Sequence, residues 1–154
     1  MSKSITRRDA LRFAGVLSLA FGAGWLRPQD VLAADWNGRA FEAKTLADVL
    51  QALGGDKFEV SPLLQLNAPD IAENGAVVPV GVSSSANLSK IAILVEKNPN
   101  PLSAAFDLAP GTLAQVSTRV KMGATSTVHA LALADGKWLL ASKEIKVTLG
   151  GCGG

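Results

Sequence analysis

Turn-forming residues divide most of this chain into short apolar runs, and this division constrains the fold more than any other feature. Clusters of Gly, Pro, Asn and Asp stand between the runs, at residues 67–70, 73–75, 98–101, 109–111 and 135–136. The predicted strands are therefore residues 63–66, 76–83, 90–96, 102–108, 112–122, 127–134 and 138–149. Short strands at this spacing predict an all-β fold, an immunoglobulin-like antiparallel β-sandwich that forms one domain.

Two local patterns support this fold. Between Val116 and Met122, residues of opposite polarity alternate, which is the period of a half-buried strand. Asp135-Gly136 between the last two runs is typical of a two-residue hairpin turn.

A short N-terminal helix is predicted before the strands. Thr45 and Asp48 have the spacing of a capping box, and Gly54-Gly55 provides a left-handed end. The apolar residues between them follow the helical period, at Leu46, Val49, Leu50 and Leu53.

The N-terminal segment resembles a twin-arginine export signal. Arg7 and Arg8 precede a weakly hydrophobic run over residues 13–25. As a helix this run reaches only about 20 Å, short of the roughly 30 Å hydrocarbon layer, which favours a cleaved signal over a membrane anchor. We expect cleavage after Ala33 or Ala34. The prediction is a signal over residues 1–33, a domain over residues 34–148 and a periplasmic mature protein.

The remaining residues offer few sites for chemistry. From Ala34 onward, ten Lys and Arg residues face eleven Asp and Glu residues, so nothing indicates a nucleic-acid partner. His129 is the sole histidine, so a metal site would lack companions. On a regular strand it shares a face with Leu131 and Leu133, which predicts a packed or interface histidine. No arrangement of Ser, His and Asp predicts an enzyme, and no cofactor or metal is expected.

The only cysteine, Cys152, lies in the final sequence Leu-Gly-Gly-Cys-Gly-Gly. Glycine gives a chain little stiffness and a narrow cross-section, so residues 149–154 are predicted to be a flexible arm that reaches roughly 20 Å. Such an arm could place a reactive thiol in the cleft of another protein. The pattern leaves open an intermolecular disulfide and an incidental exposed thiol. The glycines of the arm are Gly150, Gly151, Gly153 and Gly154.

Three segments together resemble the SoxY family of sulfur-carrier proteins in thiosulfate oxidation. They are the C-terminal Gly-Gly-Cys-Gly-Gly, the stretch Ala68–Val80 and the stretch Arg119–Gly123, joined to an exported N-terminus. The resemblance extends over essentially the whole mature chain.

The resemblance implies a non-enzymatic carrier that holds sulfur intermediates on Cys152. It implies that a SoxAX-like haem protein joins thiosulfate to the cysteine as an S-thiosulfonate, and that a SoxB-like hydrolase releases sulfate. In hosts that have one, a sulfane dehydrogenase oxidises the remaining sulfur. It also implies a heterodimer with a SoxZ-like subunit, and we expect the exposed face of one sheet to make that contact.

Overall fold

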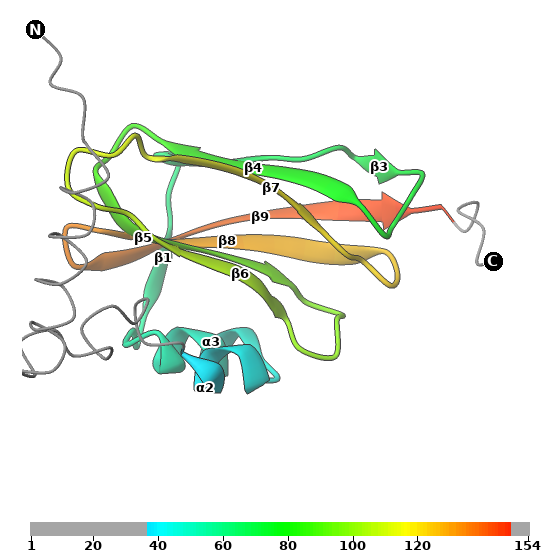
Figure 1. Ribbon diagram of the computed structural model, residues 1–154, viewed down its shortest axis with the longest axis horizontal. Coiled ribbons are helices and arrows are strands. Elements are labelled where there is room, and N and C mark those ends of the chain that lie inside the picture. Colours follow the sequence, from blue (N-terminus) through cyan, green and yellow to red (C-terminus); the bar gives the residue numbers. More distant parts are fainter. Residues whose placement is uncertain (1–36, 149–154) are drawn as a thin grey trace, which may run out of the picture. The chain divides into compact units, whose positions relative to one another are not determined.

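The computed structural model describes residues 37–148, and the predicted sandwich is confirmed within them (Figure 1). Two helices precede the strands, α2 (Gly38–Glu42) and α3 (Leu46–Ala52). The strands are β1 (Phe58–Val60), β2 (Leu64–Asn67), β3 (Ile71–Ala72), β4 (Val78–Ser84), β5 (Leu88–Val95), β6 (Leu102–Asp107), β7 (Gln115–Val120), β8 (Ser126–Ala134) and β9 (Lys137–Val147). None of the helices within 37–148 is long and apolar enough to cross a bilayer.

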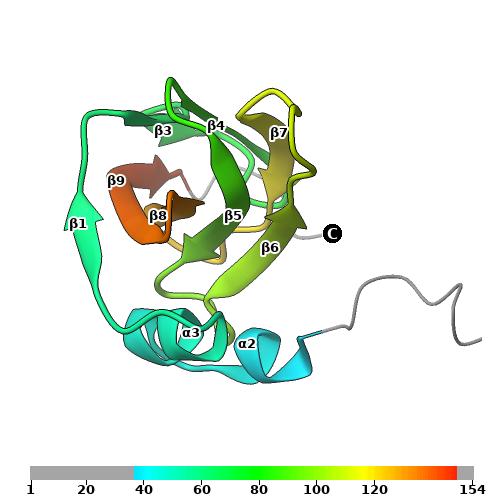
Figure 2. The same ribbon diagram turned by 90° about the vertical axis from the view of Figure 1, so that its left-hand side faces the viewer.

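The strands form a large and a small sheet. The large sheet has the order β1-β9-β8-β5-β6, with β3 also paired to β9, and the small sheet has the order β2-β4-β7. Most pairs are antiparallel, as predicted, but β1 and β3 each run parallel to β9. Figure 2 views the sandwich from one end, with the large sheet between β4 and β7 on one side and the helices on the other.

This arrangement produces two apolar layers. The main core lies between the sheets, and a second cluster lies between the large sheet and the helices. Strand β5 contributes to both, because Ile91 and Ile93 belong to the first and Ala92 and Leu94 to the second. Successive side chains of a strand point to opposite faces, so a strand covered on both sides becomes a continuous apolar run.

The predicted helix is α3, and its ends have the predicted chemistry. The Thr45 hydroxyl accepts a hydrogen bond from the backbone N–H of Asp48 (3.1 Å), and Gly54 has a φ of 87°. A Cβ on Gly55 would lie 2.5 Å from the Trp138 ring and 2.6 Å from Leu50, so glycine allows the helix end to approach the sheet.

The hairpin prediction is also confirmed. Asp135 and Gly136 have φ values of 48° and 78°, and they join β8 to β9 with Ala134 opposite Lys137. Positive φ at both central residues is the mark of a type I′ turn, whose twist matches that of the strands.

The structure adds three short elements that were not predicted. Helix α2 lies against α3, where the Asn37 side-chain amide donates to the carbonyl of Ala52 (2.8 Å). Strand β1 is exposed at all three residues, and β3 lies between two turn clusters. Most predicted strand boundaries differ from the structure by one or two residues, and the largest difference is at β7. This strand begins at Gln115 rather than at residue 112, because a turn closed by the bond from Thr112 N–H to the Ala109 carbonyl (3.0 Å) precedes it.

Candidate functional site

The candidate site is the end of the sandwich where β9 leaves the sheet. The predicted site residues Cys152, Gly150, Gly151, Gly153 and Gly154 lie outside the described residues, as do Arg7 and Arg8 of the predicted signal. The position of Thr148 nevertheless limits the cysteine. Cys152 follows Thr148 by four positions, so their Cα atoms lie within about 14 Å of each other. Any partner that meets the thiol must therefore approach this end.

Hydrogen bonds on both sides hold the last residues of β9. The backbone N–H of Lys146 donates to the Asp70 carbonyl (2.9 Å), and that of Thr148 donates to the Ala72 carbonyl (3.1 Å). The N–H of Val147 points the other way and donates to the hydroxyl of Thr125 (3.0 Å). Figure 1 shows β3 beside the end of β9. The chain is thus fixed in the sheet as far as Thr148.

The stretch Ala68–Val80, which supports the family resemblance, builds one wall of this end. The Asn74 side-chain oxygen accepts from the N–H of Ala76 (2.9 Å), and the Gly75 carbonyl accepts from Met122 N–H (2.7 Å). A Cβ on Gly75 would lie 2.5 Å from the Met122 carbonyl oxygen and 2.9 Å from Val147 Cγ1. A residue without a side chain is required here, because the turn packs directly on β9.

An ion pair ties the same loop to β9. Lys143 Nζ lies 2.9 Å from Asp70 Oδ1, and it also donates to the Ala68 carbonyl. The hydrogen bond and charge of Lys143 lower the pKa of Asp70. Because the Asp70 side chain is exposed, water weakens this pair, and the backbone bonds hold the loop more strongly.

His129 lies on the helix-covered face of the large sheet, which it shares with Leu131 and Leu133 as predicted. Its Nδ1 is 2.7 Å from the hydroxyl of Ser142 on the neighbouring strand, and its Nε2 is 3.7 Å from Glu96 Oε2. Burial lowers the pKa of His129, and Glu96 opposes that shift. A cavity of about 380 Å³ adjoins the ring, lined by Lys44, Thr45, Leu46, Leu94, Glu96, Pro101 and His129.

Within the described part of the chain, His129 lacks neighbouring side chains with which to hold a metal. Among residues 37–148, no group of three or more His, Cys, Asp or Glu side chains could hold a metal ion. The packed-histidine interpretation therefore describes its surroundings best.

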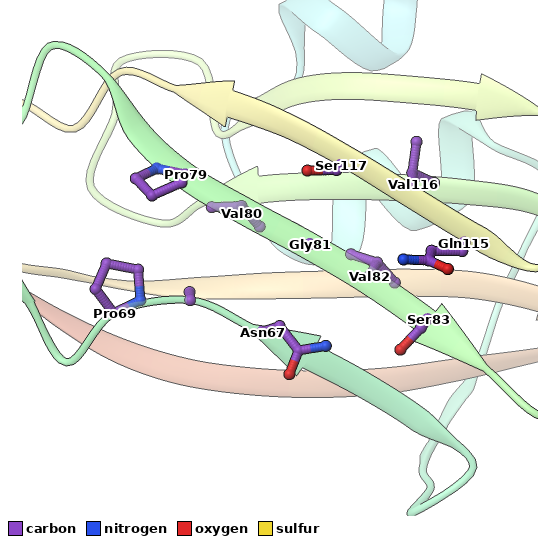
Figure 3. A pocket seen from close by; sticks show the side chains of 11 residues that line it. Asn67, Pro69, Pro79, Val80, Gly81, Val82, Ser83, Gln115, Val116 and Ser117 are labelled. Carbon is purple, nitrogen blue, oxygen red and sulfur yellow. The ribbon is translucent and has the colours of Figure 1, made fainter.

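A hollow of about 330 Å³ lies on the outer face of the small sheet (Figure 3). Figure 3 shows β4 crossing its middle, with Asn67 on one side and Gln115 and Ser117 on the other. A Cβ on Gly81 would lie at least 3.6 Å from every atom outside residues 80–82, so packing within the domain does not require glycine there. The missing side chain leaves the hollow open.

This face is unusually poor in charge. Strands β2, β4 and β7, with 4, 7 and 6 residues, contain Arg119 as their one charged residue. Strand β9, by contrast, contains four charged residues among its 11, at Lys137, Lys143, Glu144 and Lys146. Charged residues are depleted at the centres of protein interfaces, so the small sheet offers the surface best suited to a partner.

Sequence reasoning missed the residues that hold the end of β9. It treated residues 67–70 and 73–75 as turns, which concealed β3 between them. Thr125 lies immediately before β8, and no sequence motif around it indicates that its hydroxyl binds β9. The signal that pointed to this region was the stretch Ala68–Val80, whose function became visible only from its packing on Val147.

Comparison with known proteins identifies the family. The family model described as sulfur oxidation protein SoxY matches residues 49–152, so the match ends on Cys152. The solved structure of the sulfur carrier protein SoxY from Chlorobium limicola f thiosulfatophilum is 36% identical, with a TM-score of 0.59. That alignment covers 66% of this chain and 93% of the other.

A second solved structure is similar in fold alone. The superoxide reductase (neelaredoxin) from Ignicoccus hospitalis is 21% identical with a TM-score of 0.50, over 55% of this chain and 80% of the other. Comparison with curated protein sequences gives no match. The family model covers more than half of the chain. The C. limicola protein, which is 36% identical to this chain, is also a SoxY protein. This chain belongs to the SoxY family.

Proposed function

We propose that this protein is a sulfur carrier that holds thiosulfate-derived intermediates on Cys152 and presents them to separate enzymes. The observation that supports this most directly is the family match, which extends from residue 49 to the only cysteine of the chain. The C. limicola relative is itself described as a sulfur carrier protein.

The proposed loading step forms one sulfur–sulfur bond. The thiol of Cys152 and the sulfane sulfur of thiosulfate join as a cysteine S-thiosulfonate, with loss of the thiol proton and two electrons. A SoxAX-like haem protein takes up the electrons. A SoxB-like hydrolase then adds water to the terminal sulfone, which leaves as sulfate, and a persulfide remains on the cysteine. Where the host has one, a sulfane dehydrogenase oxidises this sulfur.

Fixation of the chain as far as Thr148 agrees with this role. Every intermediate stays covalently attached, so the carrier needs only to present its thiol. A fixed start for the arm means that each partner finds the thiol within about 14 Å of one end of the domain. The enzymes supply the reactive centres, and this chain supplies no catalytic group.

Replacement of Cys152 by Ser tests the proposal. We expect Cys152→Ser to abolish loading by the haem protein with thiosulfate, because the chain has no other thiol. The unfolding midpoint should stay unchanged, since the substitution lies beyond the last bonded residue of the sheet. Intact-mass spectrometry measures the adduct. A thiosulfonate adduct on the variant would refute the assignment.

The same preparation separates the carrier from its main alternative, an exported interaction module joined to a partner by a disulfide. After reduction and reloading, a carrier runs as a single chain with small adducts in non-reducing electrophoresis. A permanent covalent dimer would favour the interaction module.

Export by the twin-arginine pathway is part of the proposal, because thiosulfate oxidation by this family's system implies a periplasmic carrier. Arg7 and Arg8 would direct export, and a signal peptidase would cut after Ala33 or Ala34. N-terminal sequencing of the protein from a periplasmic fraction measures the cut. An intact N-terminus in the cytoplasmic fraction alone would contradict it.

A SoxZ-like subunit is the proposed stable partner, and the outer face of the small sheet is the surface we assign to it. The face has one charged residue, Arg119, and the hollow at Gly81 can accept a side chain from the other subunit. A face with a single charged side chain and a preformed depression allows close packing at little cost in desolvated charge.

A further inference from the structure

We propose that Thr125 is a positioning residue for the carrier arm: its hydroxyl fixes the point at which the arm begins. Asp70, Ala72 and Gly75 complete what we call the root clamp, defined by these three residues and Thr125. The inference rests on the proposed role of Cys152 as the attachment site.

The root clamp is needed because the ladder between β8 and β9 ends early. The last pair is Ser126 opposite Ile145, so Lys146, Val147 and Thr148 extend past β8. Alternate N–H groups of a strand point to opposite sides. That of Lys146 meets the carbonyl of Asp70, just before β3, and that of Thr148 meets the carbonyl of Ala72 in β3, while that of Val147 faces the side where β8 supplies no carbonyl.

Thr125 fills this gap. It is the residue immediately before β8, and its hydroxyl oxygen lies 3.0 Å from Val147 N, where a further β8 residue would have placed a carbonyl. The Val147 side chain packs on the main core, and Gly75 approaches it closely enough that a Cβ would lie 2.9 Å from Val147 Cγ1. Side chain and amide of Val147 are thus both held.

Loss of the Thr125 bond would lengthen the tether. With the clamp intact, Cys152 lies four positions after the last held residue, Thr148, and if the chain detaches back to Ile145 this number becomes seven. The probability that a flexible segment brings its end to a given point falls with roughly the three-halves power of its length. The local concentration of the thiol at a docked active site would therefore fall about twofold.

The test compares Thr125→Val with Thr125→Ser. Valine has the shape of threonine without the hydroxyl, and serine keeps the hydroxyl. Thr118→Val is the matched control, because it makes the same change in β7, where the hydroxyl forms no hydrogen bond to another residue in 37–148. Each variant is assayed for hydrogen exchange at Val147, for kcat/KM of loading by the haem protein, and for the alkylation rate with iodoacetamide.

We expect Thr125→Val to accelerate exchange at Val147 and to lower loading kcat/KM by up to about twofold, the limit set by complete detachment of the chain back to Ile145. Alkylation should be unchanged, because a small reagent reaches the thiol without docking to the domain. Thr125→Ser and Thr118→Val should behave as the wild type. A merely structural role would lower the unfolding midpoint and leave the ratio of loading to alkylation unchanged, and that result would overturn the inference.

A second measurement does not depend on sulfur loading. Nitroxide labels on Cys152 and on an added cysteine at Ala105→Cys report the distribution of distances between the arm and the domain. Thr125→Val should widen this distribution and Thr125→Ser should not. If the wild type accepts no sulfur but the distribution widens as expected, the carrier function fails and the root clamp stands. An unchanged distribution in Thr125→Val overturns the root clamp.

Discussion

At the scale of single residues, burial and a nearby carboxylate shift the pKa of His129 in opposite directions. Its side chain is 13% exposed beneath the cavity near α3, and burial favours the neutral ring. Glu96 lies 3.7 Å from Nε2 and favours the charged ring, while Lys44 lines the same cavity. Burial is the larger effect, so the pKa of His129 is lowered.

The lowered pKa predicts a loss of stability in mild acid. The unfolded chain, with a histidine pKa of about 6.5, binds the proton more readily than the folded chain, so protonation favours unfolding. The contribution is fully present above about pH 6.5 and is lost as the pH falls through the lowered pKa of the folded state. Urea unfolding of the wild type and of His129→Gln over this range measures it. We expect a flatter pH dependence in the variant, and equal slopes would contradict the assignment.

The same scale explains which site residues the sequence could reveal. Cys152 stands out because glycines surround the only thiol of the chain, a pattern visible without any fold. Thr125 cannot be recognised in this way. Its role exists only because β9 extends beyond the last residue paired with β8, and that offset is a property of strand register.

At the scale of elements, local chemistry determined what could be predicted. Helix α3 has its cap at Thr45 and its left-handed end at Gly54, and the β8–β9 hairpin has Asp135-Gly136 at its turn. Each of these signals lies within a few residues of the element that it defines. The predicted helix and hairpin were therefore correct.

The elements that escaped prediction are held by distant partners. Ile71 in β3 pairs with Lys146, and Phe58 in β1 pairs with Trp138, in both cases across most of the domain. Parallel pairing to a strand so far along the chain leaves no local pattern in two or three residues. Helix α2 has five residues, too few for a helical period, and depends on the contact between Asn37 and Ala52.

At the scale of the whole domain, the two faces of the sandwich have different tasks. The helices cover one face of the large sheet and bury its second apolar cluster. The outer face of the small sheet has no such cover among the described residues, yet it is almost free of charge. The end of β9, where the arm begins, lies at the edge of the large sheet next to β3. The hollow on the small sheet is lined by Ala68 and Pro69, which directly precede Asp70, so a partner seated there would lie beside the root clamp.

The hollow at Gly81 allows a direct test of this division. A leucine in place of Gly81 starts from a Cβ position 3.6 Å or more from its nearest neighbours, so the domain should fold with an unchanged unfolding midpoint. The added side chain would fill the depression that we assign to the SoxZ-like subunit. We expect Gly81→Leu to weaken that heterodimer at least about tenfold, equivalent to about 1.4 kcal/mol.

The control is Ala105→Leu, which adds an apolar side chain of the same size at an exposed position of β6 in the large sheet. Titration calorimetry with the SoxZ-like subunit of the same host measures both affinities. Because the root clamp and Cys152 are unchanged, loading of the isolated Gly81→Leu chain should equal that of the isolated wild type. Wild-type affinity in Gly81→Leu, or an equal loss in Ala105→Leu, would show that the subunit binds elsewhere, since only an occupied hollow makes the two substitutions differ.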